Sequence, residues 1–477
     1  MLLFATVSIF AVFTWSIAAQ QIYDIWSTTW DRYKLFTYTN LSPNPINFPT
    51  YGFGGSLTDS SAKLLNNLKS SNSGQYNSLL KTLFDPTDGA DAAGLSYLRV
   101  PLGASDFSDN AYTFDDTSVI NDIRAINPYL KVHVLPWSPP GWMKDSGNID
   151  GGNFLDQYIS TFASYLLKAV QGFQSHGIPI YAIGIQNEPQ NSNPTYPTCQ
   201  ISASQEAQIG LALRTFLSRL ADAASFDDQD TFHNAFPNKE IYFTECSGSM
   251  GSDWWSDIKW DMDNLYIGSI LHNARAALEW NLVLDGNGQP ELPGSNSCGS
   301  PPCRGVVTLS GTSWTLNQEF YSMAQASKAV LPRDQNGPFG TRIGVSVGGS
   351  MSWGLVVNAF VTGRVNPSDW LRYSIVVLNW ADTTNGAWDP QPIQTTIEFR
   401  GMQATYTFPV GVTTLWWYAP STSSIGARTD SVSVNGTTVI PTNAPLNASV
   451  KRTSSEFEMA QDSSRPILTQ YSDVKPC

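Results

Sequence analysis

Two glutamates follow short apolar runs and are placed to act as a catalytic pair. Residues 183–189 (IGIQNEP) carry an apolar run to Asn187 and Glu188, and residues 241–246 (IYFTEC) end in the same way at Glu245. In a parallel α/β barrel the carboxyl ends of the strands build the active site. One such glutamate alone is more often part of a surface ion pair. Two on matching strand ends favour a glycosidase, in which one carboxyl is acid and base and the other is the nucleophile.

Further side chains at predicted strand ends fit a neutral sugar. Asp59 is a short acceptor for sugar hydroxyls, and the flat indoles of Trp137 and Trp280 are suited to stack on pyranose rings. Arg99 ends another predicted strand, where its charge would hold a nucleophilic carboxylate ionised. Each residue alone has a plain structural explanation, but their shared location makes the group a candidate site.

The elements that must position these residues alternate along the first part of the chain. Strands are predicted at 51–57, 96–100, 131–136 and 178–185, and helices at 60–70, 155–174, 204–220 and 260–277. Alternating strands and helices indicate an α/β fold, and at this length a (β/α)₈ TIM barrel is the best candidate.

After about residue 341 the pattern changes to short strands separated by turn residues, which predicts an antiparallel β-sandwich. We therefore expect five segments: a signal peptide (1–19), a lead-in associated with the side domain (20–50), the catalytic barrel (51–335), the β-sandwich (336–420), and a Ser/Thr-rich, disordered tail (421–477).

The composition of the chain narrows the classes of molecule that it is expected to bind. The chain has 477 residues, a net charge of −13, 14% charged residues and 16 tryptophans. An acidic chain disfavours nucleic acid and anionic membranes as partners, and its polar, aromatic character suits a neutral polysaccharide or glucosyl conjugate. The four histidines are scattered and no metal-binding motif occurs, so we expect neither metal nor other cofactor. The oligomeric state is left open.

The first residues and the cysteines point to export. Residues 1–17 are apolar and small residues follow them, as in a signal peptide, and no later segment is apolar enough to span a membrane. Sequons for N-glycosylation begin at Asn40, Asn435 and Asn447. Among five cysteines, Cys298 and Cys303 bracket a Gly-Ser-Pro-Pro turn and are the expected disulfide. We expect a secreted, extracellular protein.

Several motifs, taken in order, resemble glycoside hydrolase family 30, which contains lysosomal-type glucosylceramidases and fungal endo-β-1,6-glucanases. They are GFGGSLTDSSA (52–62), LRVPL (98–102), LPWSPPGWMK (135–144), QNEP (186–189) and TEC (244–246). The segments EFYSMAQASK (319–328) and WWY (416–418) look most similar to the fungal β-1,6-glucanases.

The resemblance implies a retaining mechanism with Glu188 as acid/base and Glu245 as nucleophile. It also implies that Asn187 bonds the sugar 2-hydroxyl, and that Asp59, Trp137 and Trp280 hold the glucose on the non-reducing side. The expected activity is an endo-β-1,6-glucanase, and the first alternative is a glucosylceramidase.

The chain departs from the family pattern between the two glutamates. Only 57 residues separate Glu188 from Glu245, whereas three βα units of a barrel need roughly 90. The sequence is therefore expected to lack strands five and six. An imperfect gene model with trimmed exons would explain this, and so would a natural inactive paralogue. A catalytically impaired glucan-binding protein is accordingly the second alternative.

Overall fold

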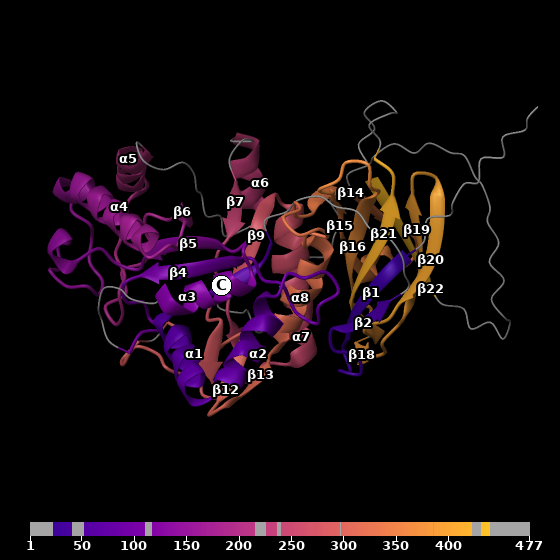
Figure 1. Ribbon diagram of the computed structural model, residues 1–477, viewed down its shortest axis with the longest axis horizontal. Helices are drawn as coiled ribbons and strands as arrows, with labels where there is room; N and C mark the ends of the chain where they lie inside the picture. The colour runs from indigo at the N-terminus through magenta and orange to yellow at the C-terminus, as the bar shows by residue number, and fades with distance from the viewer. Residues whose placement is uncertain are drawn as a thin grey trace, which may run out of the picture.

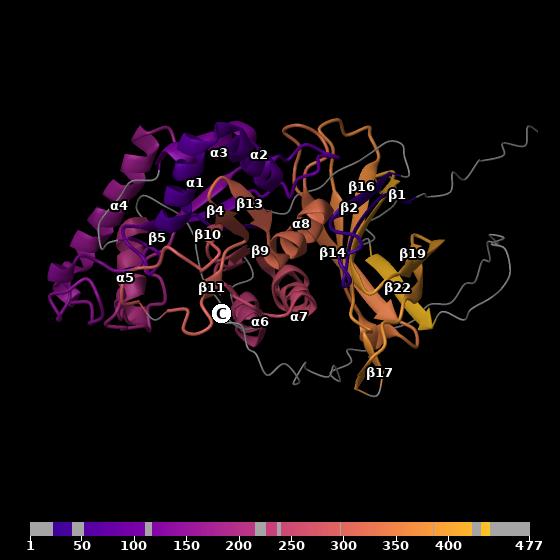
Figure 2. The same cartoon turned by 90° about the horizontal axis from the view of Figure 1, so that it is seen from below.

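The computed structural model describes residues 22–40, 52–109, 117–214, 226–235, 240–295, 297–384, 386–421 and 431–438. It has a part built around a parallel sheet and a part built around a nine-stranded β-sheet (Figure 1). Figure 2, turned by 90°, shows α7 and α8 between the two sheets, and α1, α2 and α3 on one side of the parallel sheet. The expected signal peptide lies outside the described residues.

The parallel sheet contains six described strands. Its order is β6-β5-β4-β3-β9-β7, and every neighbouring pair is parallel. The strands are β3 (Gly54–Ser56), β4 (Tyr97–Leu102), β5 (Lys131–Pro136), β6 (Ile180–Ile183), β7 (Ile241–Phe243) and β9 (Ala274–Glu279). Most of their residues are buried, as expected for a parallel sheet covered on both faces.

The sheet ends at β6 and β7, the two strands that lead to the paired glutamates. In the described part of the chain no strand lies between them in the sheet order. The hydroxyls of Tyr181 on β6 and Tyr242 on β7 are hydrogen-bonded at 3.0 Å. The two edges therefore approach each other closely enough for a side-chain contact without forming a ladder.

Helices connect these strands and cover the sheet. They are α1 (Asp59–Ser71), α2 (Ser73–Phe84), α3 (Thr117–Ile126), α4 (Ile159–Ser175), α5 (Ala203–Arg214), α6 (Phe226–Ala235), α7 (Trp254–Trp260), the π-helix η3 (Asp261–Ser269) and α8 (Gln318–Val330). The side chain of Thr58 caps α1 by accepting a hydrogen bond from the backbone N–H of Ser61. In the described residues no helix is both long and apolar enough to cross a lipid bilayer.

The helix expected at 260–277 is wrong in its second half. The helical segment occupies residues 254–269, and Ala274–Glu279 is the strand β9 instead. Its alanine-rich sequence (ARAALE) favours a helix locally. Burial between β3 and β7 overrides that preference, because packing against neighbouring strands outweighs intrinsic propensity.

Short elements join the parallel sheet to α8. The strands β10 (Val283–Asp285), β12 (Val307–Ser310) and β13 (Ser313–Leu316) form a small sheet, and β8 (Gly248–Ser249) pairs with β11 (Cys303–Arg304). Short 3₁₀ helices are η1 (Gly141–Met143), η2 (Asp156–Tyr158) and η4 (Ser352–Gly354).

The nine-stranded sheet has the order β2-β1-β21-β16-β15-β14-β22-β19-β20. Its strands are β1 (Ile22–Thr29), β2 (Thr37–Asn40), β14 (Thr341–Gly348), β15 (Leu355–Thr362), β16 (Leu371–Asn379), β19 (Ile393–Phe399), β20 (Met402–Phe408), β21 (Gly411–Ala419) and β22 (Ser431–Thr438). A two-stranded hairpin, β17 (Thr383–Thr384) and β18 (Ala387–Trp388), follows β16. Apolar side chains of β15, β16, β19, β21 and β22 share one core.

The expectation that residues 421–477 form a disordered tail is wrong for Ser431–Thr438. This segment is β22, parallel to β14 and antiparallel to β19. Val432 and Val434 are buried while Ser431 and Thr437 are exposed, which is the alternation of a strand with one face on a core. The pattern is easily missed because the surrounding sequence is rich in Ser, Thr, Asn and Pro. The rest of the expected tail, apart from Ser421, lies outside the described residues.

Candidate active site

Glu188 and Glu245 both follow strands of the parallel sheet. Glu188 comes after β6 and has a positive φ of 41°, a backbone conformation that is uncommon for a residue other than glycine. Its side chain is exposed, and its Oε2 accepts a hydrogen bond of 2.8 Å from Nδ2 of Asn191. Glu245 comes after β7, and its side chain is 29% exposed. The positive φ of Glu188 fits a functional site, because such sites often hold residues in uncommon backbone conformations.

Arg99 links the ends of the two edge strands. It lies on β4, is 1% exposed, and donates from Nη1 to Oε2 of Glu245 at 2.7 Å and from Nη2 to Oδ1 of Asn187 at 2.6 Å. Asn187 is the residue before Glu188, so one guanidinium holds the end of β6 and the end of β7 together. Hydrogen bonds from a guanidinium to a carboxylate are among the stronger protein hydrogen bonds.

Trp137 and Trp280 support this guanidinium. Their rings are stacked with centroids 4.8 Å apart and an interplanar angle of 17°. The guanidinium carbon of Arg99 lies 4.7 Å from the Trp137 ring and 5.5 Å from the Trp280 ring. The two side chains are only 1% and 3% exposed, so the open indole faces expected for sugar stacking are not presented. In this structure the pair packs against Arg99 and holds it in place.

Asp59 occupies the first turn of α1. Its carboxylate accepts a hydrogen bond from Oγ of Ser108, which belongs to the loop after β4. That placement suits a negative charge at a helix N-terminus. Asp59 is therefore joined to the same loop that carries Asp106, a residue of the site described next.

Asp106 is a third carboxylate in the site that the sequence analysis missed. It is 4% exposed, and its Oδ2 accepts a hydrogen bond of 2.7 Å from Oγ of Ser297. Burial, with a contribution from the charge of Glu188, raises the pKa of Asp106 to about 6, although the Ser297 hydrogen bond opposes the rise. Its position shortly after β4, at the edge of the sheet that bears the glutamates, was an available signal.

Asn191 and Tyr196 were also missed. Nδ2 of Asn191 donates to Glu188 at 2.8 Å and to the hydroxyl of Tyr196 at 3.0 Å. Tyr196 is buried, and burial raises its pKa to about 12, with smaller contributions from the charges of the nearby carboxylates. Both residues lie in the loop that follows Pro189, where no periodicity marks them.

Burial and the neighbouring charged groups shift the pKa of Glu245. Burial raises its pKa to about 7, the charge of Arg99 opposes the rise, and the charges of Glu188 and Asp106 add to it. Three carboxylates and one guanidinium thus act on one another in a single site. Strongly perturbed carboxyl groups in such a cluster are typical of a catalytic centre.

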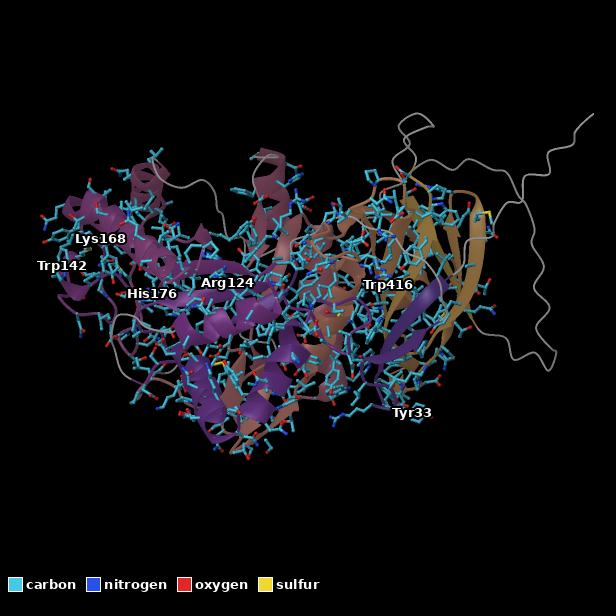
Figure 3. All side chains as sticks on the ribbon, viewed as in Figure 1. Tyr33, Arg124, Trp142, Lys168, His176 and Trp416 are labelled. Carbon is cyan, nitrogen blue, oxygen red and sulfur yellow. A yellow bond between two sulfur atoms is a disulfide. The ribbon has the colours of Figure 1, made fainter. Side chains whose placement is uncertain are left out.

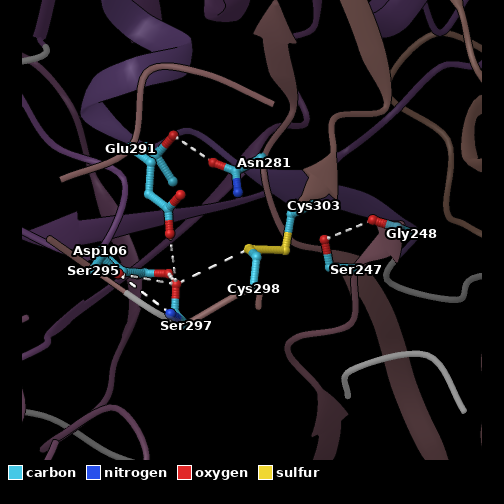
Figure 4. Close-up of a disulfide and its surroundings, with 10 residues drawn as sticks. Asp106, Ser247, Gly248, Asn281, Glu291, Ser295, Ser297, Cys298 and Cys303 are labelled. Carbon is cyan, nitrogen blue, oxygen red and sulfur yellow. Dashed lines mark hydrogen bonds between the residues drawn. A yellow bond between two sulfur atoms is a disulfide. The ribbon is translucent and has the colours of Figure 1, made fainter. Parts of the chain in front are cut away.

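A disulfide closes the loop that contacts Asp106. Cys298 and Cys303 are bonded, with their Cα atoms 5.3 Å apart, and Ser297 precedes the first of them (Figure 4). Cys199 is a buried free thiol. Among the described residues no group of three or more His, Cys, Asp or Glu side chains is arranged to hold a metal ion.

The expected glycosylation sites lie away from this cluster or outside the described residues. Asn435 is a half-buried residue of β22, and its Nδ2 donates to Oγ of Ser433 at 3.0 Å. Asn40 is the last residue of β2. Asn447 lies outside the described residues.

Comparison with known proteins identifies the family. The model of the glycosyl hydrolase family 30 TIM-barrel domain matches residues 50–126 and 118–210. An endo-1,6-β-D-glucanase of Neurospora crassa is 33% identical in an alignment of 347 positions that covers 58% of this chain and 69% of that protein. The chain belongs to glycoside hydrolase family 30. This membership confirms the resemblance drawn from the motifs.

Other family-30 relatives extend the comparison. An endo-1,6-β-D-glucanase of Trichoderma harzianum is 29% identical over 58% of this chain and 68% of its own length. The lysosomal acid glucosylceramidase of Mus musculus is 26% identical over 58% of this chain and 67% of its own length. The solved endo-β1,6-glucanase BT3312 superposes with a TM-score of 0.66 over 83% of this chain and 99% of that protein. At 22% identity this last likeness bears on the fold alone, a family-30 TIM-barrel-like fold.

Proposed function

We propose that this family-30 chain is a retaining glycoside hydrolase that cleaves β-1,6-glucan at internal bonds. The observation that carries the proposal is the double contact of Arg99 with Glu245 and Asn187, which gathers the two glutamate-bearing strand ends around one buried cation. The relatives named endo-1,6-β-D-glucanase support the choice of linkage.

The proposed reaction has two steps. Glu188 donates a proton to the glycosidic oxygen while a carboxylate oxygen of Glu245 bonds to the anomeric carbon and the bond to the leaving sugar breaks. In the second step Glu188 takes a proton from water, the water oxygen bonds to the anomeric carbon, and Glu245 is released. Such a mechanism requires the two carboxyl groups to lie about 5–5.5 Å apart.

Arg99 has two roles in this proposal. Its charge favours the ionised form of Glu245, which the attack requires, against the burial that raises the pKa of that carboxyl to about 7. Its second hydrogen bond occupies Oδ1 of Asn187, which directs the amide NH₂ of Asn187 elsewhere. That NH₂ group is the donor we assign to the sugar 2-hydroxyl. Asp59 would bind a hydroxyl of the same glucose, which Trp137 and Trp280 would contact at their edges.

The sequence gap bears on whether the chain is active. In the described residues the parallel sheet has six strands, and the gap falls between the strands that lead to Glu188 and Glu245. The contact of Arg99 with both strand ends favours a competent site over an impaired glucan-binding protein. A glucosylceramidase is the other alternative, because family members with that name are among the relatives.

The proposal also includes export of the protein and its division into segments. We propose removal of residues 1–19, a barrel over 51–335, and a side domain that combines residues 20–50 with 336–420 and the strand β22. The pairing of β1 with β21 supports the inclusion of the N-terminal residues.

The first test is reducing-end release from linear β-1,6-glucan by the full chain. We expect hydrolysis, and a loss of more than about a thousandfold in Glu245→Gln, as is usual when a catalytic nucleophile is removed. Glu398→Gln is the matched control, since Glu398 is a half-buried carboxylate of β19 in the nine-stranded sheet, and this variant should retain activity. Hydrolysis of glucosylceramide without the glucan would favour the glucosylceramidase alternative. A folded parent chain that cleaves neither substrate but still binds the glucan would replace the proposal with a binding function.

A further inference from the structure

Trp142 is a large exposed aromatic side chain at the carboxyl end of the parallel sheet, and no step described above uses it. It lies in η1, in the loop that follows β5, and is 56% exposed. Its ring meets the ring of Tyr158 edge to face, with centroids 5.1 Å apart and an interplanar angle of 89°. Figure 3 shows Trp142 at the end of the molecule opposite to Trp416 and the nine-stranded sheet. An exposed indole fixed by an edge contact keeps a face open for a flat ligand.

Lys144 fastens the Trp142 loop to the loop that follows Glu188. Lys144 is 3% exposed, and its Nζ donates to Oγ of Ser138 at 2.8 Å, to the carbonyl of Ile149 at 2.6 Å and to the carbonyl of Thr198 at 2.9 Å. All three donors of the ammonium are therefore used, and two of them close the Trp142 loop on itself. The third reaches the neighbouring loop.

Backbone contacts continue the connection between the two loops. The N–H of Gly152 donates to Oγ of Ser192 at 2.8 Å, and the N–H of Gln200 donates to the carbonyl of Gly152 at 2.9 Å. Further bridges join Asp150 to Pro197 and Asn153 to Gln200. Two loops joined at this many points form one rigid wall, which we call the acid wall (residues 137–154 and 188–201).

The acid wall is the side of the site on which the leaving sugar must lie. Its second loop begins at Glu188, and Asn191 of that loop holds both Glu188 and Tyr196. A general acid must reach the oxygen of the leaving group to protonate it, so the sugars that depart lie on the side of the acid. The proposed nucleophile Glu245 follows β7, the strand at the other end of the sheet order.

We propose that Trp142 is a stacking platform for glucosyl residues on the leaving-group side of the scissile bond. The inference rests on the proposed function and names the part of the substrate that the acid wall binds. The ligand class is a neutral β-glucan chain, whose sugar rings pack on an indole face. Such a platform favours cleavage within a chain, because it binds glucosyl units beyond the one that is released first.

The test compares two substrates that differ in what leaves. One is linear β-1,6-glucan, and the other is a 4-nitrophenyl glycoside of a β-1,6-gluco-oligosaccharide, which carries no sugar on the leaving-group side. We expect Trp142→Ala to lower kcat/KM at least tenfold on the glucan and less than threefold on the nitrophenyl glycoside. Trp142→Phe should restore most of the activity on the glucan. Trp388→Ala is the matched control, because Trp388 is also a half-exposed indole (48%) but lies on β18, and it should change neither rate.

Equal losses on the two substrates, or no loss on the glucan, would overturn the proposal. A binding measurement separates its failure from that of the proposed function. In the Glu245→Gln background, calorimetry with a β-1,6-gluco-oligosaccharide should show at least tenfold weaker binding when Trp142 is alanine. If the parent chain turns over nothing, weaker binding still supports the platform, and unchanged binding refutes it.

Discussion

Replacing Arg99 should change the pH dependence of catalysis, because this guanidinium is the counter-charge of the proposed nucleophile. Arg99→Gln removes the positive charge that lies 2.7 Å from Oε2 of Glu245. With an effective dielectric constant near 20, attraction between unit charges about 4 Å apart is of the order of 4 kcal/mol. Because the side chain of Glu245 is 29% exposed, water screens part of this attraction. Since 1.36 kcal/mol corresponds to about one pKa unit, we expect the pKa of Glu245 to rise by at least one unit.

The sign of the effect on activity follows from the required charge state. Glu245 must be ionised to attack, and its pKa is already about 7. The pH profile of kcat/KM reports the pKa values of catalytic groups in the free enzyme. A further rise in the pKa of Glu245 should therefore move the acidic limb of this profile, measured on β-1,6-glucan, toward higher pH by the same amount. Arg99→Lys keeps a charge but reaches only one of the two partners of Arg99. It should shift the limb less, and should lower kcat/KM roughly 10- to 100-fold through the loss of one charge-assisted hydrogen bond.

Arg372 provides the control for damage to the fold. It is equally buried (0% exposed), donates to Asp88 at 2.9 Å, and lies 4.0 Å from the Trp416 ring, but it belongs to β16 in the nine-stranded sheet. Arg372→Gln should lower the melting temperature about as much as Arg99→Gln without moving the acidic limb. An acidic limb that stays in place in Arg99→Gln, or that moves equally in Arg372→Gln, would refute the role of Arg99 as counter-charge.

Three further predictions concern the same cluster. Asp106→Asn removes a charge that raises the pKa of Glu245, so the acidic limb of kcat/KM should move to lower pH, and a limb that moves upward would contradict the electrostatic account. Tyr196→Phe removes the second acceptor of Asn191, which should lower kcat/KM by roughly 3- to 10-fold, about 1 kcal/mol, with an unshifted pH profile in steady-state assays. Because the raised pKa of Glu245 lets the folded state keep a proton that the unfolded chain releases, the free energy of unfolding should fall as pH rises from about 4.5 to 7, by at most about 3 kcal/mol. Glu245→Gln should flatten that fall in urea titrations, and an equal slope in both proteins would contradict it.

The sequence was most informative where structure is periodic. Apolar strands that end in a glutamate predicted that Glu188 and Glu245 lie at the carboxyl ends of their strands, because in a parallel sheet these ends all lie on one side. Arg99 was found by the same argument, although its contact with Glu245 reaches from β4 to the end of β7, a strand that is not its neighbour in the sheet. The spacing between the glutamates predicts that strands five and six are missing, and this stays a prediction, although the described part of the parallel sheet has six strands.

The remaining site residues lie in loops, where contacts between residues far apart in the sequence decide the position of each side chain. Asp106 is placed by Ser297, 191 residues further along the chain, and no local pattern links the two. The aromatic pair Trp137 and Trp280 was assigned the wrong geometry for a related reason. The presence of tryptophans at strand ends predicts stacking on sugar rings. The structure shows that these two rings stack on each other and lie against Arg99, which covers their faces.

Within the described residues, two side-chain connections join β6 and β7, the strands that lead to the proposed catalytic pair. The strands β6 and β7 are edges of the described sheet, so no ladder fixes the distance between their ends. Beyond the carboxyl ends of the strands, Arg99 joins Asn187 to Glu245. Within the strands, the hydroxyls of Tyr181 and Tyr242 are hydrogen-bonded at 3.0 Å. A pair of strands held only by side chains is easier to separate than one held by a ladder. We therefore expect the proposed catalytic pair to depend on Arg99 for position as well as for charge, which would not hold in a barrel whose continuous strands set the separation.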